Sequence, residues 1–212
     1  MFPTRTEIQE LKDQFSLWLL LSELKKHGMV TQRLKLQKLV YLADIFGTVF
    51  ARKPTTYTFI VYDLGPFSKE ITTDMDHLVS TGIVDAKEIK LWDPEHERSF
   101  DYCIREPRIA ESSKVVNKLE LGLLEKAIGF TVKVAGNLDS ESIRQLVYTE
   151  PNYVAAKKIG YKSVINPDYR FAADFRESAK RISADEYSLD LDEEQIGLLY
   201  LNYMKSHNFT LR

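Results

Sequence analysis

The sequence predicts a single α+β domain that is predominantly α-helical, with a winged-helix-like core in residues 1–106 and a helical extension in residues 107–212. Three observations predict this class. The first half contains, in order, a helix, a helix, a strand, a helix and a hairpin, which is the order of a winged helix-turn-helix unit. The second half has apolar residues at helical spacing and no strand pattern. A chain of 212 residues is a usual length for one domain with a substantial core.

The first predicted helix spans residues 6–27. Thr6 and Gln9 have the spacing of a capping box, and Gly28 is expected to end the helix. Its apolar residues cover more than one stripe, so we expect it to be central and packed on two sides. These inward positions are Ile8, Leu11, Phe15, Trp18, Leu19, Leu21 and Leu24.

The second predicted helix begins after Thr31, is weakened by Gly47 and ends before Pro54. We expect Asp44, which lies beside the apolar face, to be a helix-surface carboxylate that pairs with a lysine rather than a functional acid. The apolar face consists of Leu36, Leu39, Val40, Ala43 and Phe46, and the residues expected to face water are Arg33, Lys35 and Lys38.

A strand-to-helix corner follows. Residues 57–61 are rich in β-branched and aromatic side chains and predict a strand, and Gly65 and Pro66 predict a turn. Ser68 is the expected N-cap of a third helix that Gly82 ends. Alternating residues 87–92 and 100–105, joined by a polar tip at 93–99, predict an antiparallel hairpin that begins near Ile83.

The helical extension is predicted to begin at Pro107, with breaks at Gly129 and at Gly136. Asp139 should cap a helix that ends at Glu150 and Pro151. A short helix over 152–158 follows, and periodicity is weak from 161 to 189. The final helix, over 192–206, is expected to turn four residues inward: Ile196, Leu199, Tyr200 and Tyr203.

Composition restricts the class of protein. The net charge of −2 gives no overall electrostatic attraction to nucleic acid or to an anionic membrane. Cys103 is the only cysteine, which excludes an intrachain disulfide and a cysteine-based metal cluster. The longest apolar run is far too short to span a bilayer, and the N-terminus does not have the pattern of a signal peptide. We therefore expect a cytoplasmic protein with no membrane contact.

No catalytic motif is present. The four histidines (His27, His77, His96 and His207) are scattered, and the nucleotide-binding and hydrolase signatures are absent. We expect a non-enzyme with no catalytic residue, cofactor or metal. An enzyme with a pocket near the second helix, containing Asp44 and Tyr41, is a further alternative.

DNA binding is the main alternative, because the third helix of a winged helix enters the major groove. This helix has Glu70, Asp74 and Asp76 against Lys69 and His77 alone. Carboxylates repel phosphates, so nucleic acid is a disfavoured partner.

A protein partner is the preferred expectation. Aromatic and arginine side chains, which are enriched at interfaces, gather between residues 169 and 181. The other interpretation is that the two phenylalanines, spaced i, i+4, dock this segment on the core. The candidate partner-binding residues are Tyr169, Arg170, Phe171, Phe175 and Arg176.

Residues 35–43, 65–71, 78–84 and 138–151 together resemble the Panacea-domain family, which comprises SocA-like and GepA-like antitoxins and YwgA-like relatives. One departure is that Asp63 and Leu64 separate the aromatic Tyr62 from the Gly-Pro pair. The matching motif residues, which we interpret as structural, are Lys35, Leu36, Lys38, Leu39, Tyr41, Tyr62, Gly65, Pro66, Phe67 and Ser68. The resemblance implies a non-enzymatic protein that binds and neutralises a toxin, in some members by presenting it to a protease.

Overall fold

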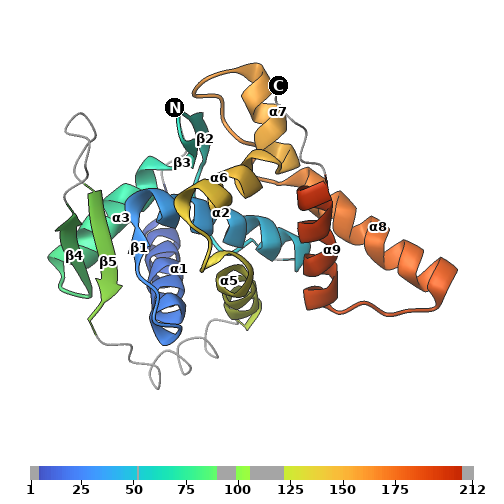
Figure 1. Cartoon of the computed structure of the whole chain (residues 1–212), viewed down its shortest axis with the longest axis horizontal. Coiled ribbons are helices and arrows are strands. Elements are labelled where there is room, and N and C mark those ends of the chain that lie inside the picture. The colour runs from blue at the N-terminus through green and yellow to red at the C-terminus, as the bar shows by residue number, and fades with distance from the viewer. Residues whose placement is uncertain (1–4, 52, 90–98, 106–121, 207–212) are drawn as a thin grey trace.

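The computed structural model describes residues 5–51, 53–89, 99–105 and 122–206. Helices make up 65% of the structure, which confirms the predicted α+β, mainly helical class. In Figure 1 the small sheet lies at one end of the molecule and α8 and α9 lie at the other. The elements are α1 (Glu7–Lys26), β1 (Thr31–Gln32), α2 (Arg33–Val49), β2 (Ile60–Tyr62), β3 (Gly65–Phe67), α3 (Lys69–Ser80), β4 (Val84–Ile89), β5 (Ser99–Ile104), α5 (Gly122–Ala135), α6 (Ser140–Tyr148), α7 (Pro151–Ile159), α8 (Arg170–Tyr187) and α9 (Glu193–Ser206).

The first half has the element order of a winged helix, with the hairpin β2–β3 inserted between α2 and α3. Strands β4 and β5 pair antiparallel, from Val84 opposite Ile104 to Ile89 opposite Ser99, and β1 adds to the outer side of β5. The predicted hairpin is therefore confirmed. Residues 93–98 of the tip expected over 93–99 lie outside the described residues, and so do residues 107–121 of the helical stretch predicted from Pro107, whereas Ser99 belongs to β5.

Helix α2 is the centre of the core. It contacts α5, α6, α8 and α9, and Figure 1 shows it running through the middle of the molecule. The five predicted apolar positions, from Leu36 to Phe46, are all buried, and so are Tyr41, Leu42 and Ile45 on its other sides. A helix that is buried on several sides needs cover on each of them, and here the four helices of the second half supply it together with β1, β3 and β5.

Side-chain caps begin α1 and α6 as predicted. The Thr6 hydroxyl accepts a hydrogen bond from the Gln9 N–H at 3.3 Å, and the Gln9 side chain accepts one from the Thr6 N–H at 2.8 Å. Asp139 accepts from the Ser142 N–H at 2.6 Å. These bonds satisfy N–H groups that have no partner within the helix, and they fix both starting points.

Several packing expectations were wrong. Ile8 and Leu11 are each 66% exposed, because the buried face of α1 also takes Asp13 and Ser16 into the interior. Leu199 is exposed as well. These helices are thus more polar inside, and more apolar outside, than simple periodicity assumes.

The predicted corner is a hairpin. The strand is shorter than expected, and Val61 pairs with Pro66 across a two-residue turn at Asp63 and Leu64. Gly65 has φ +110°, as is common for a glycine directly after a hairpin turn. Ser68 is the N-cap residue of α3 but makes no side-chain cap, and its hydroxyl donates to Glu70.

Two helical glycines give opposite predictions. Gly129 was expected to break a helix but lies within α5, where an added Cβ meets nothing within 4 Å. A Cβ on Gly197 of α9 would lie 2.9 Å from Phe50 and 3.0 Å from Phe130. Gly129→Ala should therefore raise the free energy of unfolding by about 0.5–1 kcal/mol. Gly197→Ala should lower it by about 1–3 kcal/mol in urea denaturation; equal effects of the two variants would contradict this packing.

Candidate functional site

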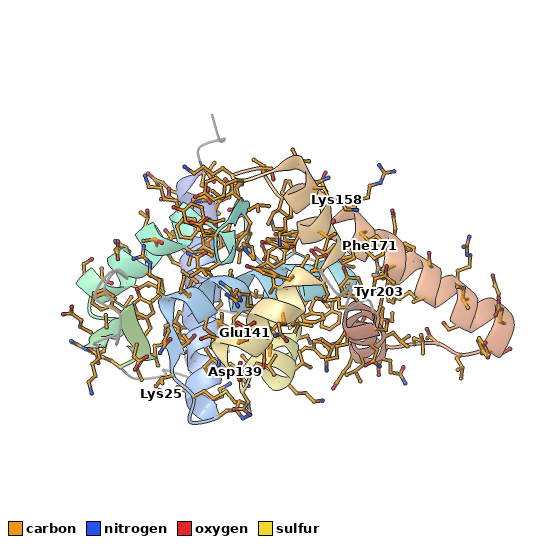
Figure 2. The ribbon with its side chains drawn as sticks, turned by 45° about the horizontal axis from the view of Figure 1, so that its top comes forward. Lys25, Asp139, Glu141, Lys158, Phe171 and Tyr203 are labelled. Carbon is orange, nitrogen blue, oxygen red and sulfur yellow. The ribbon has the colours of Figure 1, made fainter. Side chains whose placement is uncertain are left out.

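A pocket of about 220 Å³ lies between α2 and α6 and beside the β2–β3 turn. Contacts between α2 and α6 are direct, and Figure 2 shows α6, with Asp139 and Glu141 labelled, lying in front of α2. Of the eight residues that line the pocket, four are charged, three are aliphatic and one is a serine. The lining consists of Leu34, Lys35, Lys38, Leu64, Ser140, Glu141, Ile143 and Arg144. We call it the α2–α6 pocket.

Lys38 was expected to face water, and this was wrong. Its side chain is buried, with 4% of the residue exposed, and it lines the pocket. Its ammonium donates one long hydrogen bond, 3.3 Å, to the Leu34 carbonyl, and among the described residues no carboxylate forms an ion pair with it. Burial is the main cause that lowers the pKa of Lys38 to about 8, and the nearby positive charge of Arg144 is the second cause. A mostly charged lysine is therefore buried without a counter-charge from the described part of the chain.

The other two cations of the pocket already have partners. Lys35 donates to the Gly136 carbonyl at 2.6 Å, and Arg144 pairs with Glu141 one turn earlier on α6. Burial lowers the pKa of Lys35, whereas the Asp139 charge opposes this. Both lysine ammonium groups have three donors and each makes one of these hydrogen bonds, but the bond of Lys38 is the longer, 3.3 Å against 2.6 Å, and Lys38 is the more deeply buried of the two.

Exposed apolar side chains continue from the mouth of this pocket. Leu34 and Leu64 line it and are 47% and 36% exposed. Next to Leu64, the Tyr62 ring lies 5.3 Å from the ring of Tyr161, which is also exposed. A hydrogen bond with Tyr62 is the largest cause that raises the pKa of Tyr161 to about 12. These four residues form what we call the turn patch.

The predicted partner-binding residues do not form one surface. Tyr169 is buried, with its ring 5.8 Å from Tyr41, and Phe175 packs edge-on against Tyr200 at 5.0 Å. Figure 2 shows Phe171 beside Tyr203 of α9, and their ring centroids are 5.4 Å apart. Arg170 and Arg176 pair with acids of their own helix, Asp174 and Glu177. The phenylalanines thus dock α8 on α9.

A carboxyl group with four donors lies at the junction of α2, α7 and α9. Glu150 is fully buried and accepts from the Tyr41 hydroxyl, from Tyr200 at 3.0 Å, from Asn152 at 2.6 Å and from the Tyr153 N–H at 2.8 Å. Burial is the main cause that raises the pKa of both tyrosines well above the ordinary value, so both hydroxyls keep their protons. Sequence analysis assigned Glu150 only to the end of a helix.

Asp44 pairs with a lysine as expected, but it does so in the interior. Its Oδ2 lies 3.6 Å from Lys53 Nζ, and it accepts from the Thr55 N–H at 3.0 Å and the Thr55 hydroxyl at 2.8 Å. The residue has no exposed surface. Burial is the main cause that raises the pKa of Asp44 from 3.8 to about 7.

This shift predicts that stability falls as pH rises. Between about pH 4 and pH 7 the folded chain keeps the Asp44 proton whereas the unfolded chain has lost it, so rising pH favours unfolding. We expect the free energy of unfolding of the wild type, relative to Asp44→Asn, to fall by an amount on the order of 2–4 kcal/mol over this window. Urea denaturation at pH 4, 5.5 and 8 measures it. A difference that stays constant with pH would contradict the raised pKa.

The third helix is less acidic on its outer face than the sequence predicts. Asp74 of α3 is buried and pairs with Arg5 at 2.7 Å, and Glu70 accepts from Ser68 and from the Thr58 N–H. Only Asp76, of the three carboxylates, is exposed. The outer face of α3 is therefore close to neutral rather than acidic.

Neither Asp44 nor Tyr41, the residues of the enzyme alternative, lines the α2–α6 pocket or a larger pocket between α5 and α9. That second pocket, of about 340 Å³, contains Lys126 and Lys133 already paired with Glu193 and Glu194.

Within the described ranges, no group of three His, Cys, Asp or Glu side chains is placed to share a metal ion. None of the helices described here has the length and apolar character needed to cross a membrane.

Comparisons with known proteins add no relative to this description. No family model matches the chain, and neither a curated protein nor a solved structure is similar to it at a significant level.

Proposed function

We propose that this chain is a non-enzymatic protein-binding module that acts as an antitoxin-type protein, binding and neutralising a partner. The observation that carries the proposal is the turn patch beside the α2–α6 pocket. Tyr161 is 55% exposed and Leu34 47%, and exposed apolar side chains that gather at one place are typical of interaction sites. Aromatic anchors next to a pocket are the usual centre of binding energy at protein interfaces.

The sequence resemblance supports the same proposal from a different direction. Three of its motifs meet at this place, since Lys38 belongs to the first, Gly65 to the second and Arg144 to the last. A Cβ on Gly65 would lie 3.3 Å from Lys38 Cε. Two of the motif residues that we interpreted as structural, Lys35 and Lys38, therefore also line the pocket.

Co-expression tests the proposal. The chain would be produced with the products of the two open reading frames that flank its gene, and both growth and co-purification would be measured. We expect one neighbour to be toxic alone, to be harmless with this chain and to co-purify with it. Two harmless neighbours that do not co-purify would overturn the proposal.

A pair of tyrosine variants locates the contact. Tyr161→Ser should lower co-purification at least tenfold, because it removes an aromatic anchor of the turn patch. Tyr187→Ser is the matched control, since Tyr187 is 65% exposed at the end of α8, outside the patch. Equal co-purification of both variants would place the interface elsewhere on the chain.

DNA binding is the second candidate, and the winged-helix order with a nearly neutral outer face on α3 favours keeping it. Exposed Lys69 would approach phosphate at the start of α3. Micromolar affinity for duplex DNA that weakens steeply as salt rises from 50 to 200 mM would support this function. Affinity that is absent, or that does not change with salt, would reject it.

A further inference from the structure

We propose that the α2–α6 pocket binds an acidic side chain of a partner protein, whose carboxylate pairs with the Lys38 ammonium while Leu34, Leu64 and Ile143 contact the apolar residue beside it. The identity of this ligand rests on the proposed protein-binding function. The pocket itself is argued from Lys38 and its surroundings.

The buried positive charge of Lys38 favours binding of an anion. Burying a cation without a counter-charge costs several kcal/mol, so a fold retains one only if something else compensates. Lys38 is 4% exposed, and its described neighbours supply a carbonyl and a second cation, Arg144, rather than a carboxylate. An incoming anion would remove this imbalance, and it would gain a charge-assisted hydrogen bond in a site shielded from water.

The residues that line the α2–α6 pocket determine which kind of anion fits beside Lys38. Phosphate is best held by several free cations or by an arginine fork, but Lys35 is held by the Gly136 carbonyl and Arg144 by Glu141. The Glu141 carboxylate at the rim would repel a doubly charged group more than a singly charged one. One weakly bonded ammonium beside Leu34, Leu64 and Ile143 therefore fits a single carboxylate attached to an apolar chain.

The size of the pocket agrees with this ligand. A volume of about 220 Å³ accommodates an aspartate or glutamate side chain with part of a neighbouring residue, and not a whole folded element. The turn patch begins at the mouth, at Leu34 and Leu64, so the rest of the partner would lie across Tyr62 and Tyr161. The pocket would thus fix the register of a larger protein contact.

Lysine-labelled protein tests the proposal without the natural partner. The full chain carrying [ε-13C]lysine would be titrated with the capped peptide Ac-Leu-Asp-Leu-NH2 at pH 6.5, and the Lys38 signal assigned as the one missing from Lys38→Met. We expect a saturable shift of that signal in the millimolar range. The matched peptide Ac-Leu-Asn-Leu-NH2 should bind at least tenfold more weakly, since it lacks the charge.

Two outcomes of the titration would overturn the proposal: no saturable shift up to 20 mM peptide, or an equal shift with inorganic phosphate, which would indicate a general anion site. Thermal denaturation separates binding from folding. Lys38→Met should raise Tm by about 3–6 °C, because it removes an uncompensated buried charge, while Lys12→Met, at an exposed position of α1, should leave Tm and peptide binding unchanged. A fall in Tm for Lys38→Met would show that the charge is already compensated.

Failure of the carboxylate site and failure of the proposed antitoxin-type function give different results. If the peptide binds but no flanking product co-purifies, the proposed antitoxin-type function fails and the carboxylate site stands. If a flanking product co-purifies equally well with wild type and with Lys38→Met, the carboxylate site fails and the protein-binding function stands.

Discussion

Glu150→Ala is expected to lower the free energy of unfolding by about 4 kcal/mol or more, the largest effect of any single change considered. The substitution leaves four buried donors without an acceptor, two of them the hydroxyls of Tyr41 and Tyr200. Each buried donor that loses its partner costs about 1–3 kcal/mol. Because these donors come from α2, α7 and α9, the junction of three helices is weakened at once. Urea denaturation followed by circular dichroism measures the change.

Two control variants sharpen this prediction. Tyr200→Phe removes one donor but leaves Glu150 three others, so it should cost only about 1–2 kcal/mol. Glu125→Ala, on the exposed side of α5, should stay within about 0.5 kcal/mol of the wild type. A Glu150→Ala protein less than 1 kcal/mol below the wild type would show that Glu150 does not hold the junction.

Gly65→Val is expected to lower the free energy of unfolding by about 2–4 kcal/mol. A φ of +110° is strained for any residue with a Cβ, and more so for a β-branched one. The new Cβ would also lie 3.3 Å from Lys38 Cε and 3.4 Å from Tyr148. The variant should therefore narrow the α2–α6 pocket and destabilise the hairpin together, and thermal denaturation measures the second effect.

Gly160→Val is the matched control for Gly65. Its φ is +137°, so the backbone strain is similar, but an added Cβ there meets nothing within 4 Å. The difference between the two variants isolates the contact with Lys38 and Tyr148. Equal stabilities would mean that the pocket wall yields to the new side chain.

Elements with strong local signals could be predicted from the sequence. Helices α1, α3, α6 and α9 begin and end within two residues of their predicted bounds, because the signals that start and stop a helix, such as the caps of α1 and α6 and the glycines after α1 and α3, act over a few residues. Helix α8 was missed. Only two residues of α8, Ala172 and Ser183, are buried, and Figure 1 shows the helix extending away from the centre of the molecule. A helix covered on so narrow a strip leaves weak periodicity in its sequence.

The candidate site could be predicted only in part. Lys38 and Gly65 were singled out within motifs, but their contact depends on a hairpin that folds back over α2. One signal was available for Lys38: residues 39–43 are all apolar or aromatic, so α2 has no continuous polar face on which a lysine could remain in water. The approach of Arg144 to Lys38 joins positions more than 100 residues apart, and no local pattern encodes it.

The most direct test of the account is the pH titration of the Lys38 side chain, followed through its [ε-13C] signal in the full chain without ligand. A buried ammonium with Arg144 nearby and no carboxylate partner should titrate with a pKa of about 8. A midpoint above pH 10, as for a lysine in water or in an ion pair, would contradict the claim that this pocket holds a cation without a counter-charge.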